Sequence, residues 1–276
     1  MRRAEVDAAW LAALRASADR PPARARVQLR AAVAGSAVAT TIGSVEPGFL
    51  RPVASLRLPD GRAALEDAGA RGWILHGRTD GDVTASLALL AAALRDAGLA
   101  HAWRNEQLAV PDETGRVAGT VERAVVRVLG ISTRAVHLVG LTDDGRVWLQ
   151  LRSQSKANDP GLWDTLMGGM IPAVDTLETA LARETWEEAG LILSSLYGLV
   201  WGGRIAMRRP ADHGGAGYVV EDIDWFRCTV PNGMTPQNQD GEVERFELVA
   251  PADIAARLVR NEFTAEAALI ICEALS

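Results

Sequence analysis

Cysteine is scarce in this chain, and its scarcity limits the chemistry that the protein can perform. Only Cys228 and Cys272 occur among 276 residues. Two cysteines cannot build a metal cluster, and a secreted, disulfide-stabilised fold would need more of them. Histidine is also rare, and none of the 4 histidines has a histidine or cysteine partner at the spacing of a zinc site. We therefore expect no disulfide, no zinc site and a location in the reducing cytoplasm.

Long apolar runs and an excess of positive charge are missing as well. No segment approaches the ~20 apolar residues of a membrane-spanning helix. Glu5, Asp7 and Arg15 interrupt the segment in which a signal peptide would have its apolar stretch. The formal net charge is −6, whereas the backbone of a nucleic acid favours basic surfaces. We expect neither a membrane nor a nucleic acid as a partner, and the sequence does not reveal the oligomeric state.

The remaining composition is that of a globular protein, with 48% hydrophobic and 23% charged residues. A chain of 276 residues can form one large or two small domains. The segment PDETGR at 111–116 is polar and turn-rich, so it is the candidate linker. We predict a smaller α+β N-terminal domain of unknown role at 1–118 and a second domain at 119–276.

Hydrophobic periodicity predicts the elements of each domain. In the first part we expect helices at 4–18 and 82–97, and short strands within 26–58 and at 73–77. A helix expected at 121–130 could belong to either part. In the second part we expect a hairpin of 135–141 and 146–152, a helix at 176–189, strands near 197–208, 217–230 and 243–249, and helices near 251–259 and 263–274. Strands around one helix, with further helices outside, favour an α/β sandwich with a mixed sheet.

The helix at 176–189 carries three carboxylates on one face. Glu184, Glu187 and Glu188 are spaced i, i+3 and i+4, so they repel one another unless a cation lies among them. Mg²⁺ prefers such oxygen ligands and often bridges to substrate phosphates. The alternative is a solvated acidic helix face. Arg183 beside the triplet, and Gly190 as a helix stop, favour the metal site.

The same run belongs to a longer pattern that resembles the Nudix box, G-x5-E-x7-R-E-U-x-E-E-x-G-U, in which U is a bulky aliphatic residue. The matching positions are Gly169, Arg183, Glu184, Glu187, Glu188, Gly190 and Leu191. Two positions depart from the pattern. Asp175 replaces a glutamate and has a shorter reach, so its contact with the helix is in question, whereas Thr185 replaces an aliphatic residue away from the chemistry.

Further segments resemble a Nudix group that carries a domain related to thiamine pyrophosphokinase before the hydrolase domain. The segments are VERAVVRVLGISTRAVHL, RSQSKANDPG, GLWDTLMGGM, DGEVERFELV and NEFTAEAALI. The resemblance implies a Nudix-type α/β/α sandwich with a mixed sheet, preceded by the smaller α+β domain. It also implies a Mg²⁺-dependent hydrolase of a small phosphorylated metabolite. Some members of the group convert thiamine diphosphate or its damaged analogues to monophosphates.

The resemblance assigns metal-binding roles to specific residues. Mg²⁺, with Mn²⁺ as a substitute, is expected on Glu184 and Glu188, with Glu187 as a third or water-mediated ligand. The backbone carbonyl of Gly168 is a further ligand by family analogy, because glycine allows a close approach of the backbone. Arg183 is expected to orient the carboxylates through salt bridges.

The general base and the phosphate ligands are less sharply indicated. Glu184 could act as the base. The resemblance implies instead a glutamate on a downstream loop, for which Glu242 and its neighbour Glu244 are the candidates, and a solvated turn before a strand is the alternative for both. Arg152 and Lys156 follow the predicted hairpin and suit phosphate oxygens, although ordinary surface cations would look the same in the sequence.

Four functions compete on these grounds. A diphosphohydrolase acting on a thiamine-diphosphate-like substrate leads, and a pyrophosphatase of nucleoside diphosphate derivatives is the near alternative. An isoprenoid diphosphate isomerase would need a cysteine and a glutamate across an apolar pocket, and neither Cys228 nor Cys272 lies in such a setting. A non-catalytic nucleotide-binding module usually lacks box glutamates, and the three of the box helix, Glu184, Glu187 and Glu188, are present here.

Overall fold

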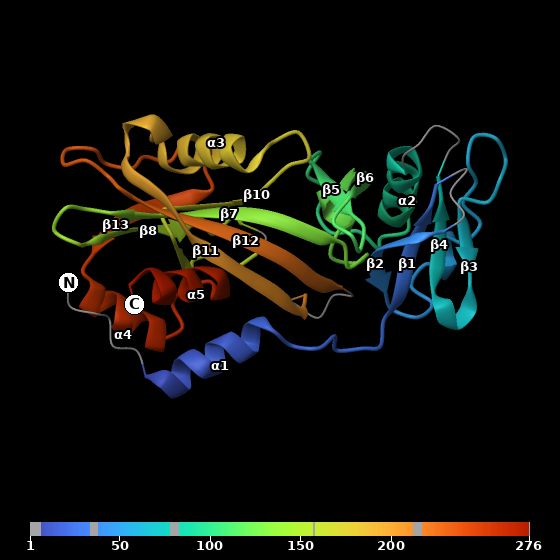
Figure 1. Ribbon diagram of the computed structural model, residues 1–276, viewed down its shortest axis with the longest axis horizontal. Helices are drawn as coiled ribbons and strands as arrows, with labels where there is room; N and C mark the ends of the chain where they lie inside the picture. Colours follow the sequence, from blue (N-terminus) through green and yellow to red (C-terminus); the bar gives the residue numbers. More distant parts are fainter. Residues whose placement is uncertain (1–6, 34–37, 78–82, 157, 212–216, 276) are drawn as a thin grey trace.

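The computed structural model of the chain describes residues 7–33, 38–77, 83–156, 158–211 and 217–275. Its elements form two adjoining lobes (Figure 1). The first lobe is built from residues 27–131, and the second from residues 132–275 together with the N-terminal helix α1 (Ala8–Ala18). None of the helices in the described ranges has the length and apolar character of a membrane span.

The first lobe contains a four-stranded sheet in the order β2-β1-β4-β3. Its strands are β1 (Val27–Ala32), β2 (Thr40–Val45), β3 (Leu65–Asp67) and β4 (Trp73–His76), and only β1 and β4 run parallel. The helix expected at 82–97 is α2 (Thr84–Asp96), and residue 82, at the expected start, lies outside the described residues. Side chains of β1 and β4 join those of α2 in one hydrophobic core, which holds this lobe together.

A hairpin of β5 (Gln107–Pro111) and β6 (Val117–Glu122) follows α2. The segment 111–116, expected as a linker, forms its turn, where the Asp112 carboxylate accepts hydrogen bonds from the backbone N–H groups of Thr114 and Arg116 at 2.9 and 3.1 Å. The helix expected at 121–130 is wrong. The chain leaves β6 at Glu122 and makes only a short 3₁₀ turn, η3 (Arg123–Val125). Apolar residues of this segment are buried in an irregular path, and their spacing imitates a helical stripe.

The second lobe is built on a seven-stranded mixed sheet. The main path is β11-β12-β7-β8-β13, with β10 paired to β7 and β9 paired to β8. The bounds are β7 (Ser132–Leu141), β8 (Val147–Arg152), β9 (Trp163–Asp164), β10 (Met167–Met170), β11 (Tyr197–Pro210), β12 (Tyr218–Thr229) and β13 (Val243–Val249). β12 runs parallel to β7, and the other pairs are antiparallel. The expected hairpin and the three later strands are confirmed.

Helices cover both faces of this sheet, which gives the expected α/β/α sandwich (Figure 1). On one face, α3 (Leu177–Ala189) buries Ala180 and Leu181 against even-numbered β7 residues such as Val136 and Leu138. On the other face, α4 (Pro251–Val259) and α5 (Ala265–Ala274) pack with odd-numbered residues of the same strand. The alternation of a strand therefore separates two cores within one lobe.

The packing crosses the expected division of the chain at two places. Helix α1, from the N-terminal part, packs on α5 and β11, and the N–H of Arg20 donates to the carbonyl of Arg208 at 2.7 Å. Conversely, the core of the first lobe extends to Ile131 and includes Met170. The boundary at 118 stays a prediction. Core packing favours a boundary after Ile131, where the chain passes from the first lobe to the second.

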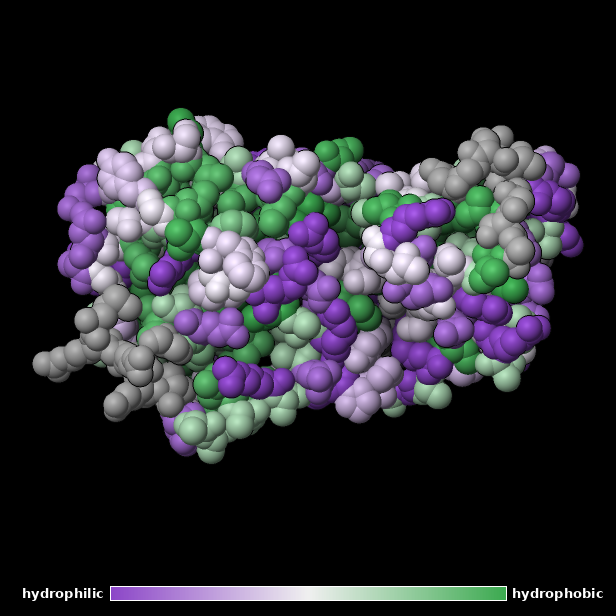
Figure 2. All heavy atoms as spheres, viewed as in Figure 1, coloured by the Kyte–Doolittle hydropathy of each residue, from purple (hydrophilic) through white to green (hydrophobic). Residues whose placement is uncertain are grey.

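Several large apolar side chains are exposed near the end of α3 and the start of β11, where Figure 2 shows hydrophobic residues at the upper left. They include Trp186, Ile192, Tyr197, Val200 and Trp201. None of these five side chains lines the cleft described next, so this surface is separate from the site.

Candidate active site

A cleft opens where the strands beside β7 diverge. β10 pairs with residues 135–138 of β7, whereas β8 pairs with β7 only at residues 140 and 141. The cleft lies among these strands, α3 and the first lobe, and ten acidic and five basic side chains line it. They are Glu106, Asp159, Asp164, Glu184, Glu187, Glu188, Glu221, Asp240, Glu242 and Glu266, with Arg123, Arg127, Arg152, Lys156 and Arg183. A site with this surplus of carboxylates favours a cation.

The acidic face of α3 reaches the cleft because both ends of the helix are fixed locally. Thr176 caps the first turn by accepting from the N–H of Thr179, and the Thr179 hydroxyl accepts from the N–H of Thr176. Gly190 ends the helix at φ +64°, a left-handed conformation that glycine adopts without strain. Glu184, Glu187 and Glu188 all line the cleft, as their spacing predicts.

Arg183 forms ion pairs with three carboxylates at the acidic face. Its guanidinium lies 2.9 Å from Asp175, 3.1 Å from Glu184 and 2.6 Å from Glu187, measured between nitrogen and carboxylate oxygen. Burial opposes its charge, but Glu184, Asp175 and Glu187 together raise the pKa of Arg183. The shorter side chain of Asp175 therefore still makes the contact that the sequence left in question.

Glu188 is the most enclosed of the three carboxylates, at 1% exposure. Its Oε2 accepts from the N–H of Gly168 and from the side-chain amide of Gln150, each at 2.9 Å. Its Oε1 lies 3.2 Å from the ammonium of Lys156. Burial raises the pKa of Glu188, although Lys156 and the two hydrogen-bond donors act in the opposite direction.

Two glycines let the backbone of β10 approach these groups. A Cβ at Gly169 would lie 2.4 Å from the carboxyl carbon of Glu184, and a Cβ at Gly168 would lie 2.3 Å from the ring of His137. Burial and the neighbouring Glu188 raise the pKa of Glu184 to about 8, against the effect of Arg183. A carboxyl group that is hard to ionise in this way is stabilised when a cation joins it.

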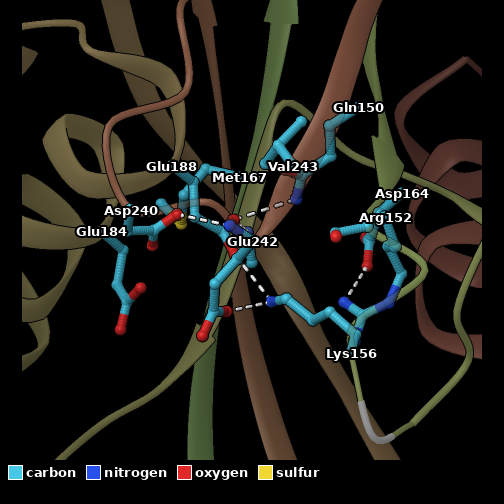
Figure 3. A network of polar contacts seen from close by, with 12 residues as sticks. Gln150, Arg152, Lys156, Asp164, Met167, Glu184, Glu188, Asp240, Glu242 and Val243 are labelled. Carbon is cyan, nitrogen blue, oxygen red and sulfur yellow. Dashed lines mark hydrogen bonds and ion pairs between the residues drawn. The ribbon is translucent and has the colours of Figure 1, made fainter.

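Lys156 and Arg152 occupy different positions at the cleft (Figure 3). The ammonium of Lys156 points at Glu188 and also forms an ion pair with Glu242. Burial alone would lower the pKa of Lys156, but Glu188 and Glu242 outweigh it and raise the pKa. Burial alone would raise the pKa of Glu242, but Lys156 lowers it on balance. Arg152 contacts Asp164 at 3.2 Å and the backbone carbonyls of residues 158 and 159.

Several cleft residues have no local sequence pattern that predicts their role. Gln150 looks like any polar strand residue until its contact with Glu188 is visible. His137 is buried and also lines the cleft, and its Nδ1 lies 3.0 Å from the hydroxyl of Thr165. Arg127 comes from the first lobe and contacts Asn158 at 3.2 Å. Each depends on a contact between distant segments, which a local pattern does not reveal.

The donor set suits a hard divalent cation. Glu184, Glu187 and Glu188 offer carboxylate oxygens, which Mg²⁺ and Mn²⁺ prefer. Within the described ranges, no set of three or more histidine, cysteine, aspartate or glutamate side chains already converges as a metal-binding group. Arg183 and Lys156 are the cations that these carboxylates contact, so a metal ion has to share the carboxylates with them. The roles assigned to Gly168 and Arg152 stay predictions.

Comparison with known proteins identifies relatives of this chain. The sequence profile of the NUDIX domain matches residues 132–269. Nudix hydrolase 20, chloroplastic, of Arabidopsis thaliana is 31% identical over 207 residues, which cover 70% of this chain and 52% of that protein. Nudix hydrolase 24, chloroplastic, of the same plant is 28% identical over 65% of this chain and 50% of that protein. The chain thus spans about half the length of these curated relatives. The structure of DR0079 from Deinococcus radiodurans has a TM-score of 0.49 and 20% identity, over 60% of this chain and 97% of that chain.

Proposed function

This chain belongs to the Nudix family of hydrolases, and on that premise we propose that it hydrolyses the diphosphate linkage of a small phosphorylated metabolite to a monophosphate. The observation that carries the proposal is the acidic face of α3, whose three glutamates line one cleft with Lys156 and Arg152. We propose thiamine diphosphate or an analogue as the substrate, because segments outside the box resemble the group that acts on such compounds. We propose a cytoplasmic location, because a chain of 276 residues with only two cysteines is typical of a reducing compartment.

The cleft residues have distinct tasks in this proposal. A divalent cation, Mg²⁺ or Mn²⁺, held by Glu184, Glu187, Glu188 and the carbonyl of Gly168, would neutralise phosphate charge and acidify water. Arg183 keeps the carboxylates in place through its three ion pairs. Arg152 and Lys156 bind phosphate oxygens.

Glu242 takes the proton of the attacking water in the same scheme. Its side chain is half exposed at the mouth of the cleft, so water can reach it. The contact with Lys156 keeps it ionised, which a base requires.

An isomerase acting through a cysteine fits the cleft poorly. Burial raises the pKa of Cys228 to about 12 and that of Cys272 to about 11, and neither thiol lines the cleft. Loss of the helix glutamates would favour a non-catalytic module, and this chain keeps Glu184, Glu187 and Glu188.

A hydrolysis screen tests the proposal. The protein with Mg²⁺ is given thiamine diphosphate, sugar nucleotides, dinucleotides and nucleoside diphosphate derivatives, and the products are resolved by chromatography. We expect a monophosphate product, and loss of turnover by at least about 10²-fold in Glu184→Gln and Glu188→Gln with the fold intact. Preference for a nucleoside diphosphate derivative would replace the thiamine assignment, and full activity of both variants would refute the metal site.

A further inference from the structure

Lys156 is the only lysine in the chain, whereas 28 residues are arginine. The side chain of this single lysine is 14% exposed and lies between the carboxylates of Glu188 and Glu242 (Figure 3). An ammonium is a compact charge on a flexible stem, and a guanidinium is a rigid planar fork. The one lysine thus stands where a compact cation that can change partners is useful.

Glu188 offers only one oxygen to a new ligand. Its Oε2 already accepts two hydrogen bonds, from Gly168 and Gln150. Both donors are fixed, since Gly168 lies in the paired strand β10 and Gln150 is 1% exposed on β8. The remaining oxygen, Oε1, is the one that Lys156 contacts. A metal ion that uses Glu188 therefore meets the ammonium at this atom.

We propose that Lys156 is a built-in competitor of the divalent cation, and that it sets the metal affinity of the site. The inference rests on the proposed function, because it assumes that Glu188 is a metal ligand. When the cation takes Oε1, repulsion between the two positive charges drives the ammonium away from Glu188. The long stem of Lys156 lets it move toward substrate phosphate oxygens, so one side chain serves both the carboxylate and the phosphate.

Removal of the charge should change two properties in opposite directions. Without the ammonium, a metal ion no longer displaces a charged hydrogen-bond donor from Oε1, so it binds more tightly. In the presence of a chelator, the buried carboxylate of Glu188 loses its charged partner, so the protein becomes less stable. A lysine that only bound substrate would change neither property.

Direct titration tests the first effect. Free Mn²⁺ is measured by electron paramagnetic resonance with the wild type, Lys156→Met, Lys156→Gln and Lys156→Arg. We expect both neutral variants to bind Mn²⁺ about tenfold more tightly, the factor that corresponds to one charge-assisted hydrogen bond. Lys156→Arg keeps the charge and should show no tightening. Equal or weaker binding by both neutral variants would overturn the proposal.

Thermal unfolding tests the second effect. With EDTA, Lys156→Met should unfold about 4 °C or more below the wild type, and Mn²⁺ should raise its Tm more than it raises that of the wild type. An unchanged Tm in EDTA would show that the ammonium of Lys156 does not stabilise the buried carboxylate of Glu188.

A single lysine also allows a direct view of the displacement. Protein labelled with ¹³C-lysine should give one Cε–Hε cross-peak in its NMR spectrum. We expect Mg²⁺ alone to shift this cross-peak along the same binding curve as the metal titration. A cross-peak that moves only when a diphosphate is added would overturn the competition. If the wild type binds no divalent cation, the proposed function itself fails; if the wild type binds and the neutral variants bind no tighter, only this inference fails.

Discussion

Substitution of Gly169 by alanine should displace the carboxyl group of Glu184 and leave the stability of the fold almost unchanged. A Cβ at this position would lie 2.4 Å from the carboxyl carbon of Glu184, and 2.5 and 2.7 Å from its oxygens. Gly169 lies in the extended strand β10 and is not among the residues with positive φ, so alanine suits its backbone. The contact is with the far end of a flexible side chain, so the carboxyl group moves and the strand stays.

The size of the movement follows from these distances. Ordinary contact begins near 3.4 Å, so the carboxyl group has to shift by about 1 Å. A misplacement of about 1 Å in a catalytic site can lower the rate by about 10²-fold. We expect a loss of that order in kcat with Mg²⁺ at saturation, together with weaker Mg²⁺ binding. Alanine fits the backbone of a strand, and it leaves the unfolded chain less conformational freedom than glycine does. The Tm should therefore change little.

Steady-state kinetics and circular dichroism melts measure the two quantities. The comparison variant is Gly168→Ala, whose Cβ would lie 2.3 Å from the buried ring of His137. That ring is held by Thr165 and cannot step aside as a carboxyl group can, so this variant should lose stability first. If Gly169→Ala keeps kcat within about threefold of the wild type, the position of Glu184 is not critical.

Three further predictions concern the base, the pH dependence and the N-terminal helix. Glu242→Gln should lower kcat by about 10²-fold or more with KM little changed. Glu244 is exposed, and Glu244→Gln is the control. Equal, mild effects of the two substitutions would assign the base to Glu184. The pKa of Glu184 is about 8 in the folded protein and 4.5 without the fold, so folding favours its protonated form. In EDTA, denaturant melts should therefore show stability falling as pH rises from about 5 to about 8, and Mg²⁺ should stabilise the protein more at the upper end of this range; a flat profile would contradict the buried position of Glu184. Removal of α1 should lower the Tm, because α1 covers part of α5, but turnover per folded molecule should persist, because none of its described residues lines the cleft.

The parts of the site that follow from the sequence are those controlled by one helix. A period of 3.6 residues places Glu184, Glu187 and Glu188 on one face whatever surrounds them, and the helix carries its own cap and stop. The apolar run at 135–141 likewise predicts a strand, and the structure confirms it as part of β7, in which residues 135–140 are buried. These features are local, so a single sequence is sufficient to predict them.

Features that depend on distant segments could not be predicted in the same way. Residues 121–130 have helical spacing of apolar residues, yet pairing of Glu122 with Gln107 holds the start of the segment in β6, and only a 3₁₀ turn follows. Helix α1 was predicted as a helix, but its partner α5 lies at the other end of the chain. Amphipathic patterns show which face is buried, and they do not show against what.

The cleft combines both kinds of information, and this explains why the box alone does not determine its chemistry. The helix brings Glu188 to the cleft, but the strands β8 and β10 decide which of its oxygens is free. Lys156 then contacts that oxygen from a segment 32 residues earlier in the chain. Because the helix is common to the family and these partners lie outside the box, metal affinity can differ between members that share every box glutamate. The contacts of Lys156 and Gln150 therefore have to be measured in this chain, and they cannot be inferred from the box.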